Sequence, residues 1–118
     1  MLLPMDESRI EAFAAERARL NEVVMRHAGT NMKRFWALDH QAYLDGVLPA
    51  KTKELLGLVA SLVLRCDDCV NYHLMQCREA GVTTEELEET LNVGLLVGGS
   101  ITIPHLRRAF AIWEELLG

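Results

Sequence analysis

The sequence contains few of the residues that interrupt helices or build sheets. Only three prolines occur among its 118 residues, and aromatic residues make up 6% of the chain. No segment has the alternating run of β-branched residues that is typical of a strand. Because helix-start and helix-stop residues recur along the whole chain instead, the sequence predicts an all-α fold.

Basic residues are also in the minority. Lys and Arg number 12 against 17 Asp and Glu, and the formal net charge is −5. The basic residues are scattered, and the pair Arg107-Arg108 is too short to form a patch. Nucleic acids and anionic membranes are bound by clustered Lys and Arg. We therefore expect neither as a partner.

Long apolar runs and secretion signals are absent as well. No apolar run reaches the roughly 18 residues that a membrane span needs. The first five residues lead directly into Asp6 and Glu7, so the basic and apolar segments of a signal peptide are missing. We expect a cytoplasmic protein. In that reducing compartment, a Cys-x-x-Cys motif indicates a redox-active or metal-binding site.

Apolar residues, by contrast, make up 50% of the chain. A domain of this size buries only about two-thirds of the surface that its unfolded chain exposes, so apolar patches should remain on a monomer. We therefore expect a homo-oligomer. Since no linker, repeat or low-complexity tract is visible, we expect one domain over residues 1–118.

Helix-boundary residues predict a bundle of about six helices. Gly29 is suited to a left-handed cap that ends the first helix, and Gly98-Gly99 ends the fifth. Thr83 and Glu86 have the spacing of a capping box. The third helix is apolar on nearly every side, so we expect it to be buried all round. The predicted helices cover about residues 7–27, 31–44, 50–64, 67–80, 83–97 and 104–118.

The residues that carry chemistry lie at the start of the fourth predicted helix. Cys66, Cys69 and His73 share one helix face, because successive residues are rotated by about 100°. Residues three apart in a helix have Cα atoms roughly 5 Å apart, which is within the range for a disulfide. A reversible Cys66–Cys69 disulfide is therefore feasible.

A reactive cysteine here needs help to ionise, since a free thiol is only about 3% thiolate at neutral pH. The helix N-terminus lowers the thiol pKa by roughly one unit, whereas Asp67 and Asp68 act against it. His73 is placed to accept a proton from Cys69, and Glu54 could orient its imidazole. The alternative for Glu54 is an ordinary acid in the first turn of a helix.

Several residues have a second interpretation. Cys66 lies nearer the helix end, so we expect it to be the more exposed thiol, although the spacing to His73 favours Cys69 as the nucleophile. Cys66, Cys69 and His73 are also conceivable zinc ligands. Cys77 is interpreted as a small core residue, and His105 as a surface or capping residue rather than part of a site. Trp36 and Trp113 are expected in the core.

Glu54, twelve residues before a Cys-x-x-Cys-x-x-x-His motif in an all-helical chain of this length, resembles the carboxymuconolactone decarboxylase family. The resemblance is to its alkylhydroperoxidase D-like branch and covers about residues 49–113. It implies a helical bundle that assembles as a trimer or hexamer. We expect no cofactor and no bound metal.

The resemblance also implies a thiol-dependent peroxidase. Cys69 would be the peroxidatic thiol, Cys66 its resolving partner, and His73 and Glu54 a proton relay. The partners would be a hydroperoxide substrate and an external dithiol reductant. Asp68 is a departure, because the alkylhydroperoxidase proper has a histidine there.

Two other functions compete with the peroxidase. A non-enzymatic oligomeric sensor would use the same cysteine pair to change its packing on oxidation. A lyase of the carboxymuconolactone decarboxylase type is less favoured, because the namesake decarboxylases generally lack the pair. A bundle with inert buried cysteines would resist oxidation altogether.

Overall fold

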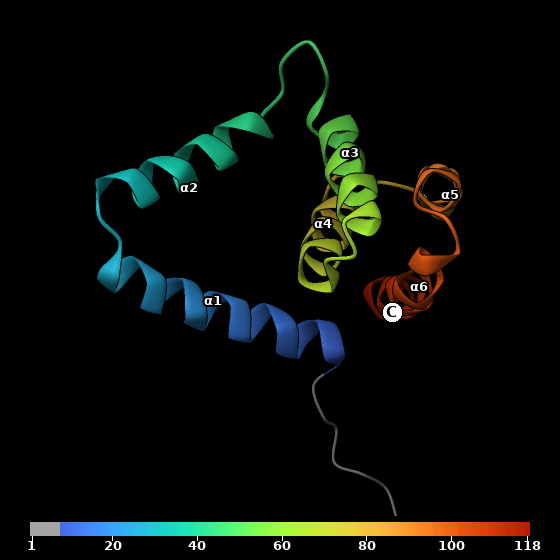
Figure 1. Cartoon of the computed structure of the whole chain (residues 1–118), viewed down its shortest axis with the longest axis horizontal. Helices are drawn as coiled ribbons and strands as arrows, with labels where there is room; N and C mark the ends of the chain where they lie inside the picture. The colour runs from blue at the N-terminus through green and yellow to red at the C-terminus, as the bar shows by residue number, and fades with distance from the viewer. Residues whose placement is uncertain (1–7) are drawn as a thin grey trace, which may run out of the picture. The chain divides into compact units, whose positions relative to one another are not determined.

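The computed structural model describes residues 8–118, and these form six α-helices and no strand. Figure 1 shows their order along the chain. The predicted all-α fold is confirmed, while a short 3-10 turn, Ser100–Thr102, was not predicted. No helix in this described part is long and apolar enough to cross a membrane. The α-helices are α1 (Arg9–His27), α2 (Thr30–Ala42), α3 (Ala50–Val63), α4 (Asp67–Glu79), α5 (Thr84–Gly98) and α6 (Ile103–Leu117).

The chain forms two compact units, which divide between Leu44 and Asp45. The described part of the first unit contains α1 and α2. Helix α1 begins after Ser8, whose hydroxyl accepts a hydrogen bond from the Glu11 amide at 3.2 Å. The predicted start at Glu7 lies outside the described residues. One domain over residues 1–118 stays a prediction.

Two expectations for the first unit are wrong. Gly29 has a φ of −87°, so it is not a left-handed cap; α1 ends instead with Ala28 in an extended conformation. Trp36 is exposed rather than in the core, and α2 contains no buried residue. The second helix was predicted correctly, but a helix prediction does not tell whether another element covers its apolar side.

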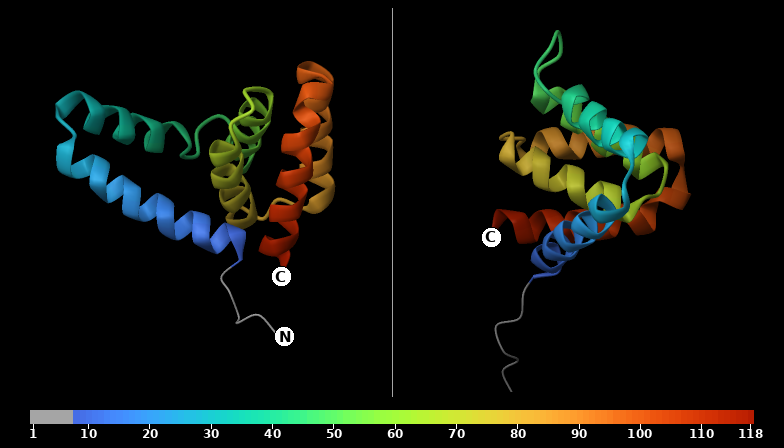
Figure 2. Two further views of the ribbon diagram at one scale, coloured as in Figure 1. Left: turned by 60° about the horizontal axis from the view of Figure 1, so that its bottom comes forward. Right: turned by 90° about the vertical axis from the view of Figure 1, so that its left-hand side faces the viewer.

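The second unit holds the larger core. Helix α3 packs against both α4 and α5, and α4 packs against α6 (Figure 2). The helices α3 and α5 approach closely at Gly94, where an added Cβ would lie 2.9 Å from the Leu62 side chain. Trp113 is buried, as predicted, and its indole N–H donates to the Thr84 hydroxyl at 2.9 Å. Fully buried residues include Leu58, Leu62, Leu74, Cys77, Leu87 and Leu91.

The boundaries of α5 follow the sequence. Thr83 and Glu86 form the predicted capping box, in which each side chain accepts from the other residue's amide. At the other end, Gly99 takes a φ of 81° and stops the helix at Gly98. Both signals are local, so they could be recognised without knowledge of the tertiary structure.

The prediction that α3 is buried all round is wrong. Its neighbours α4 and α5 cover Leu58 and Leu62, whereas Leu56 is 52% exposed. Leu64, which directly follows the helix as its C-cap, is 76% exposed. An apolar helix must find partners on every side to be fully buried, and the described chain provides them on part of its circumference.

The turn between α3 and α4 sets the start of the cysteine motif. The amide of Arg65 donates to the Leu62 carbonyl at 2.9 Å, and the amide of Cys66 donates to the Ser61 carbonyl at 3.1 Å. These two bonds make a Schellman motif, whose left-handed position is usually glycine. Here Arg65 occupies it with a φ of 60°, the only positive φ of a non-glycine residue among residues 8–118.

The same motif recurs at the end of α4 with glycine in the left-handed position. The amide of Gly81 donates to the Arg78 carbonyl at 3.2 Å, and the amide of Val82 donates to the Cys77 carbonyl at 3.0 Å. Gly81 has a φ of 80°, and an added Cβ would meet no atom within 4 Å. The two turns thus differ in conformational cost rather than in hydrogen bonding.

We expect Arg65→Gly to stabilise the protein by about 0.5–1 kcal/mol, because glycine adopts a positive φ without strain. Gly81→Arg should destabilise it by about 1 kcal/mol for the same reason. Urea unfolding of the oxidised proteins, all at the same protein concentration, measures the free energy of unfolding of both variants and the parent. Equal stability of the Gly81→Arg protein and its parent would contradict this account of the turns.

Candidate functional site

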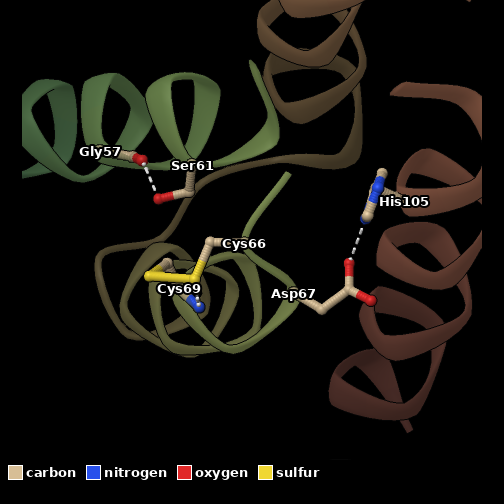
Figure 3. Close-up of a disulfide and its surroundings, with 6 residues drawn as sticks. All are labelled: Gly57, Ser61, Cys66, Asp67, Cys69 and His105. Carbon is tan, nitrogen blue, oxygen red and sulfur yellow. Dashed lines mark hydrogen bonds and ion pairs between the residues drawn. A yellow bond between two sulfur atoms is a disulfide. The ribbon is translucent and has the colours of Figure 1, made fainter. Parts of the chain in front are cut away.

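The cysteine pair lies at the N-terminus of α4. Cys66 is the N-cap residue, and its sulfur accepts a hydrogen bond from the Cys69 amide at 3.2 Å. Cys66 and Cys69 form a disulfide with a Cα–Cα distance of 5.3 Å, shown in Figure 3. The predicted pairing is therefore present in the structure. After reduction, the Cys69 amide and the dipole of the helix end would both favour the thiolate form of Cys66.

The two cysteines differ in exposure, and the difference is the reverse of the predicted one. Cys69 is exposed, whereas Cys66 is half-buried. The reason is the Schellman motif, which ties the Cys66 backbone to Ser61 in the last turn of α3. The expectation that Cys66 is the more accessible thiol is wrong, because a position at the end of a helix is not always a position at the surface.

Glu54 and His73 meet in the interior of the second unit. The Glu54 Oε1 and the His73 Nδ1 are 2.8 Å apart, and their side chains are only 8% and 10% exposed. An ionised carboxylate can only accept a hydrogen bond, so Nδ1 carries the proton and donates it to Glu54. In a neutral imidazole this leaves Nε2 as the atom that accepts a proton.

The α3–α4 contact thus brings together residues that lie 19 positions apart. His73 follows Cys69 by one helical turn, a rise of about 6 Å. The structure therefore holds the disulfide at the start of α4 and, one turn further along, a histidine of α4 that is paired with a buried carboxylate of α3. The chemical roles of Cys66, Cys69, His73 and Glu54 stay predictions.

Cys77 is a free cysteine in the core, as predicted, and is fully buried. Burial raises the pKa of its thiol to about 12, and the negative charge of Glu54 adds to the effect. A thiol with so high a pKa is protonated at neutral pH and is a poor nucleophile. Cys77 is therefore chemically distinct from the disulfide pair.

His105 has a partner that the sequence did not reveal. Its Nδ1 lies 2.7 Å from the Asp67 Oδ1, and the Arg108 Nε lies 2.8 Å from the Asp67 Oδ2. Partial burial of Asp67 opposes its ionisation, but the hydrogen bonds and charges of His105 and Arg108 outweigh this and lower its pKa. Asp67 lies between the two cysteines, so His105 belongs to the surroundings of the motif rather than to a free surface.

No group of three His, Cys, Asp or Glu side chains in residues 8–118 is arranged to hold a metal ion. In the zinc interpretation Cys66, Cys69 and His73 would be the ligands. Here Cys66 and Cys69 are bonded to each other, and His73 is bonded to Glu54.

The sequence profile of the carboxymuconolactone decarboxylase family matches residues 30–115. The chain belongs to this family. Among curated family relatives, an uncharacterised protein of Cupriavidus necator is 33% identical over 85 residues, 72% of this chain and 75% of that protein. Protein 4 of the cox locus of Paracoccus denitrificans, also uncharacterised, is 29% identical over 84 residues, 71% of this chain and 76% of that protein.

Crystal structures of TM1620 from Thermotoga maritima share the fold. In one structure the TM-score is 0.88 with 54% identity, over 90% of this chain and 93% of that chain. The other structure has a TM-score of 0.83 and 56% identity, over 89% of each chain. It is described as a carboxymuconolactone decarboxylase family protein with a suggested part in the antioxidative response. Apo-lpg0406 from Legionella pneumophila shares the family fold. Its identity to this chain is 24% and the TM-score is 0.85, over 93% of this chain and 98% of that chain.

We expect Cys77 to resist alkylation in the folded, reduced protein at pH 8, while Cys66 and Cys69 react. Its raised pKa also affects stability. Between about pH 9 and pH 12 the unfolded thiol loses its proton before the folded one, so the contribution of Cys77 to stability falls as pH rises. Iodoacetamide labelling and peptide mapping measure the first effect, with urea-unfolded protein as the control. Alkylation of Cys77 as fast as of Cys69 would contradict its burial.

Proposed function

We propose that this protein is a thiol-dependent peroxidase of the alkylhydroperoxidase D-like type. One observation carries the proposal: a Cys66–Cys69 disulfide at a helix N-terminus lies one turn before a buried His73–Glu54 pair. A disulfide is the oxidised product of such a cycle, and the histidine is the base that its first step needs. The suggested antioxidative role of the Thermotoga relative agrees with this chemistry.

In the oxidation step, the thiolate of Cys69 attacks the terminal oxygen of a hydroperoxide. The O–O bond breaks, the sulfur becomes a sulfenic acid, and the released alkoxide takes up a proton to leave as an alcohol. Cys69 is suited to this role because it is the exposed cysteine. His73, with Nδ1 bonded to Glu54, takes the proton from Cys69 through Nε2, directly or through water, and returns it to the alkoxide.

In the resolving step, the sulfur of Cys66 attacks the sulfenic sulfur of Cys69. The S–S bond forms and the hydroxyl leaves as water. The 5.3 Å Cα–Cα distance allows this bond without unwinding the helix. The two cysteines are thereby oxidised by two electrons, and the hydroperoxide is reduced by two.

An external dithiol then restores the pair. One of its thiolates attacks the sulfur of Cys69, the exposed cysteine, and Cys66 departs as the leaving thiolate. The second thiolate of the dithiol then attacks the mixed disulfide and releases Cys69, so the dithiol leaves as a disulfide. The hydrogen bond from the Cys69 amide to the Cys66 sulfur stabilises that leaving group. Cys69 is exposed, whereas the Cys66 sulfur accepts a hydrogen bond from an amide. We therefore assign different roles to the two cysteines.

We also propose that the protein works as a homo-oligomer, a trimer or hexamer. Large apolar side chains at the end of α5 support this, since Leu96 is 77% exposed and Val97 is 71% exposed. A second copy of the chain would remove them from water. Light scattering after size exclusion should give a mass several times that of one chain, and Leu96→Glu should lower it. A monomeric parent protein would contradict this assembly.

We expect Cys69→Ser to abolish the turnover of an organic hydroperoxide with dithiothreitol as reductant, because no sulfenic acid can form at that position. Glu54→Gln should lower the second-order rate constant by about tenfold to a hundredfold, because the amide no longer anchors the imidazole as a carboxylate does. Peroxide consumption under excess dithiol measures both effects.

Cys77→Ala is the matched control, since it removes a thiol of the same chain that the mechanism does not use. It should retain the parent rate constant. Unchanged turnover in Cys69→Ser would remove Cys69 from the mechanism. Oxidation of the parent once, without further cycles in any dithiol, would favour a redox sensor over a peroxidase.

A further inference from the structure

Asp67 lies in an unfavourable place for an acid. It is the first residue of α4, directly between the two cysteines in sequence, and Asp68 follows it in the same turn. A negative charge next to a thiol disfavours the thiolate and raises the thiol pKa. Thiolate formation is required in every step of the proposed cycle, so Asp67 acts against that chemistry unless its charge is neutralised.

Helix α6 supplies two groups that neutralise it. Figure 3 shows the Asp67 carboxylate extending toward His105 rather than toward the disulfide. Its Oδ1 meets the His105 Nδ1 at 2.7 Å, and its Oδ2 meets the Arg108 Nε at 2.8 Å. Both carboxylate oxygens are thereby engaged, each by a different residue of α6, 38 and 41 positions further along the chain.

The protons in this cluster can be placed from the chemistry of the groups. An ionised carboxylate has no hydrogen to donate, so the His105 Nδ1 carries the hydrogen of the 2.7 Å bond. That nitrogen then cannot accept from Arg108, whose Nη2 lies 3.2 Å away. The Arg108 guanidinium forms an ion pair with Asp67.

We propose that His105 and Arg108 screen the charge of Asp67 and so preserve the thiolate form of the cysteine pair. This inference rests on the proposed function in one respect, namely that the reduced pair reacts as a thiolate. His105 and Arg108 would touch neither the substrate nor the reacting sulfur. They are positioning residues that act through Asp67.

Other titratable groups lie on the elements that carry and flank the cysteines, and they remain in place when α6 is altered. Glu54 reaches the site from α3, Asp68 and His73 belong to α4, and Arg65 lies in the preceding turn. Glu54 is already paired with His73. The contribution of α6 is therefore measured as a difference between variants that share this background.

The size of the effect follows from the distance between neighbouring residues in a helical turn. Two charges about 6–8 Å apart at an effective dielectric constant between about 20 and 80 shift a pKa by about 0.4–2 units. The Asp67 side chain is 39% exposed and that of Arg108 is 53% exposed, so solvent reduces the effect. We expect a shift of about 0.5–1 unit, a threefold to tenfold change in thiolate at neutral pH.

The test titrates the reduced protein by thiolate absorbance and by its reaction rate with a neutral aromatic disulfide. The double variant His105→Gln/Arg108→Gln leaves Asp67 unscreened and should raise the pKa of the more reactive thiol by 0.5–1 unit. Asp67→Asn removes the negative charge while Arg108 stays in place, and it should lower the pKa of that thiol. In the triple variant, the pKa of the same thiol should lie within a few tenths of a unit of its value in the parent. Arg107→Gln, which removes an exposed charge one residue away, is the matched control and should change little.

Opposite signs are the diagnostic result. If the cluster were only a clamp between α4 and α6, Asp67→Asn and the double variant would break the same bonds and shift the thiol in the same direction. That result, or no shift in either variant, would overturn the inference. Thermal unfolding of the same proteins reports the clamp separately. The titration uses no hydroperoxide, so a failure of peroxidase turnover in the parent would sink the proposed function and leave this inference standing.

Discussion

The buried hydrogen bond between Glu54 and His73 is the interaction on which the site depends. Glu54 is the only buried carboxylate among residues 8–118, and the residues that follow it in α3 are mostly apolar. A buried ionised group that loses its partner costs about 3–5 kcal/mol. The pair therefore holds α3 against α4 and orients the His73 imidazole. Stability of the helix contact and orientation of the ring are two results of one bond.

The N-terminus of α4 affects the cysteine pair in several ways. Its free amides are available because no preceding turn accepts them, and one of them donates to the Cys66 sulfur. The acids in the first turn are favoured there by the helix dipole, although they oppose a thiolate. Contact with α6 resolves this conflict for Asp67, because His105 and Arg108 hold its carboxylate away from the disulfide.

Local signals predicted the helices correctly but failed where the answer depended on contact with a second element. The capping box of Thr83 and Glu86 and the stop at Gly98 depend on neighbouring residues, so their interpretation was correct. The predicted cap at Gly29 was wrong, because glycine permits a positive φ without requiring one. Burial on all sides of α3 was wrong because apolar composition does not tell how many neighbours a helix has.

The sequence by itself determined that Cys69 and His73 lie about one turn apart on α4, since helical rotation fixes the relation of residues four apart. It also offered Glu54 as a group that could orient His73, and the resemblance to a family implied the same role. Only the tertiary structure decided that Cys69 is the exposed cysteine, because the turn through Arg65 and Ser61 sets the depth of Cys66. It also decided the partner of Asp67: residues 38 positions apart have no fixed relation until α6 packs against α4.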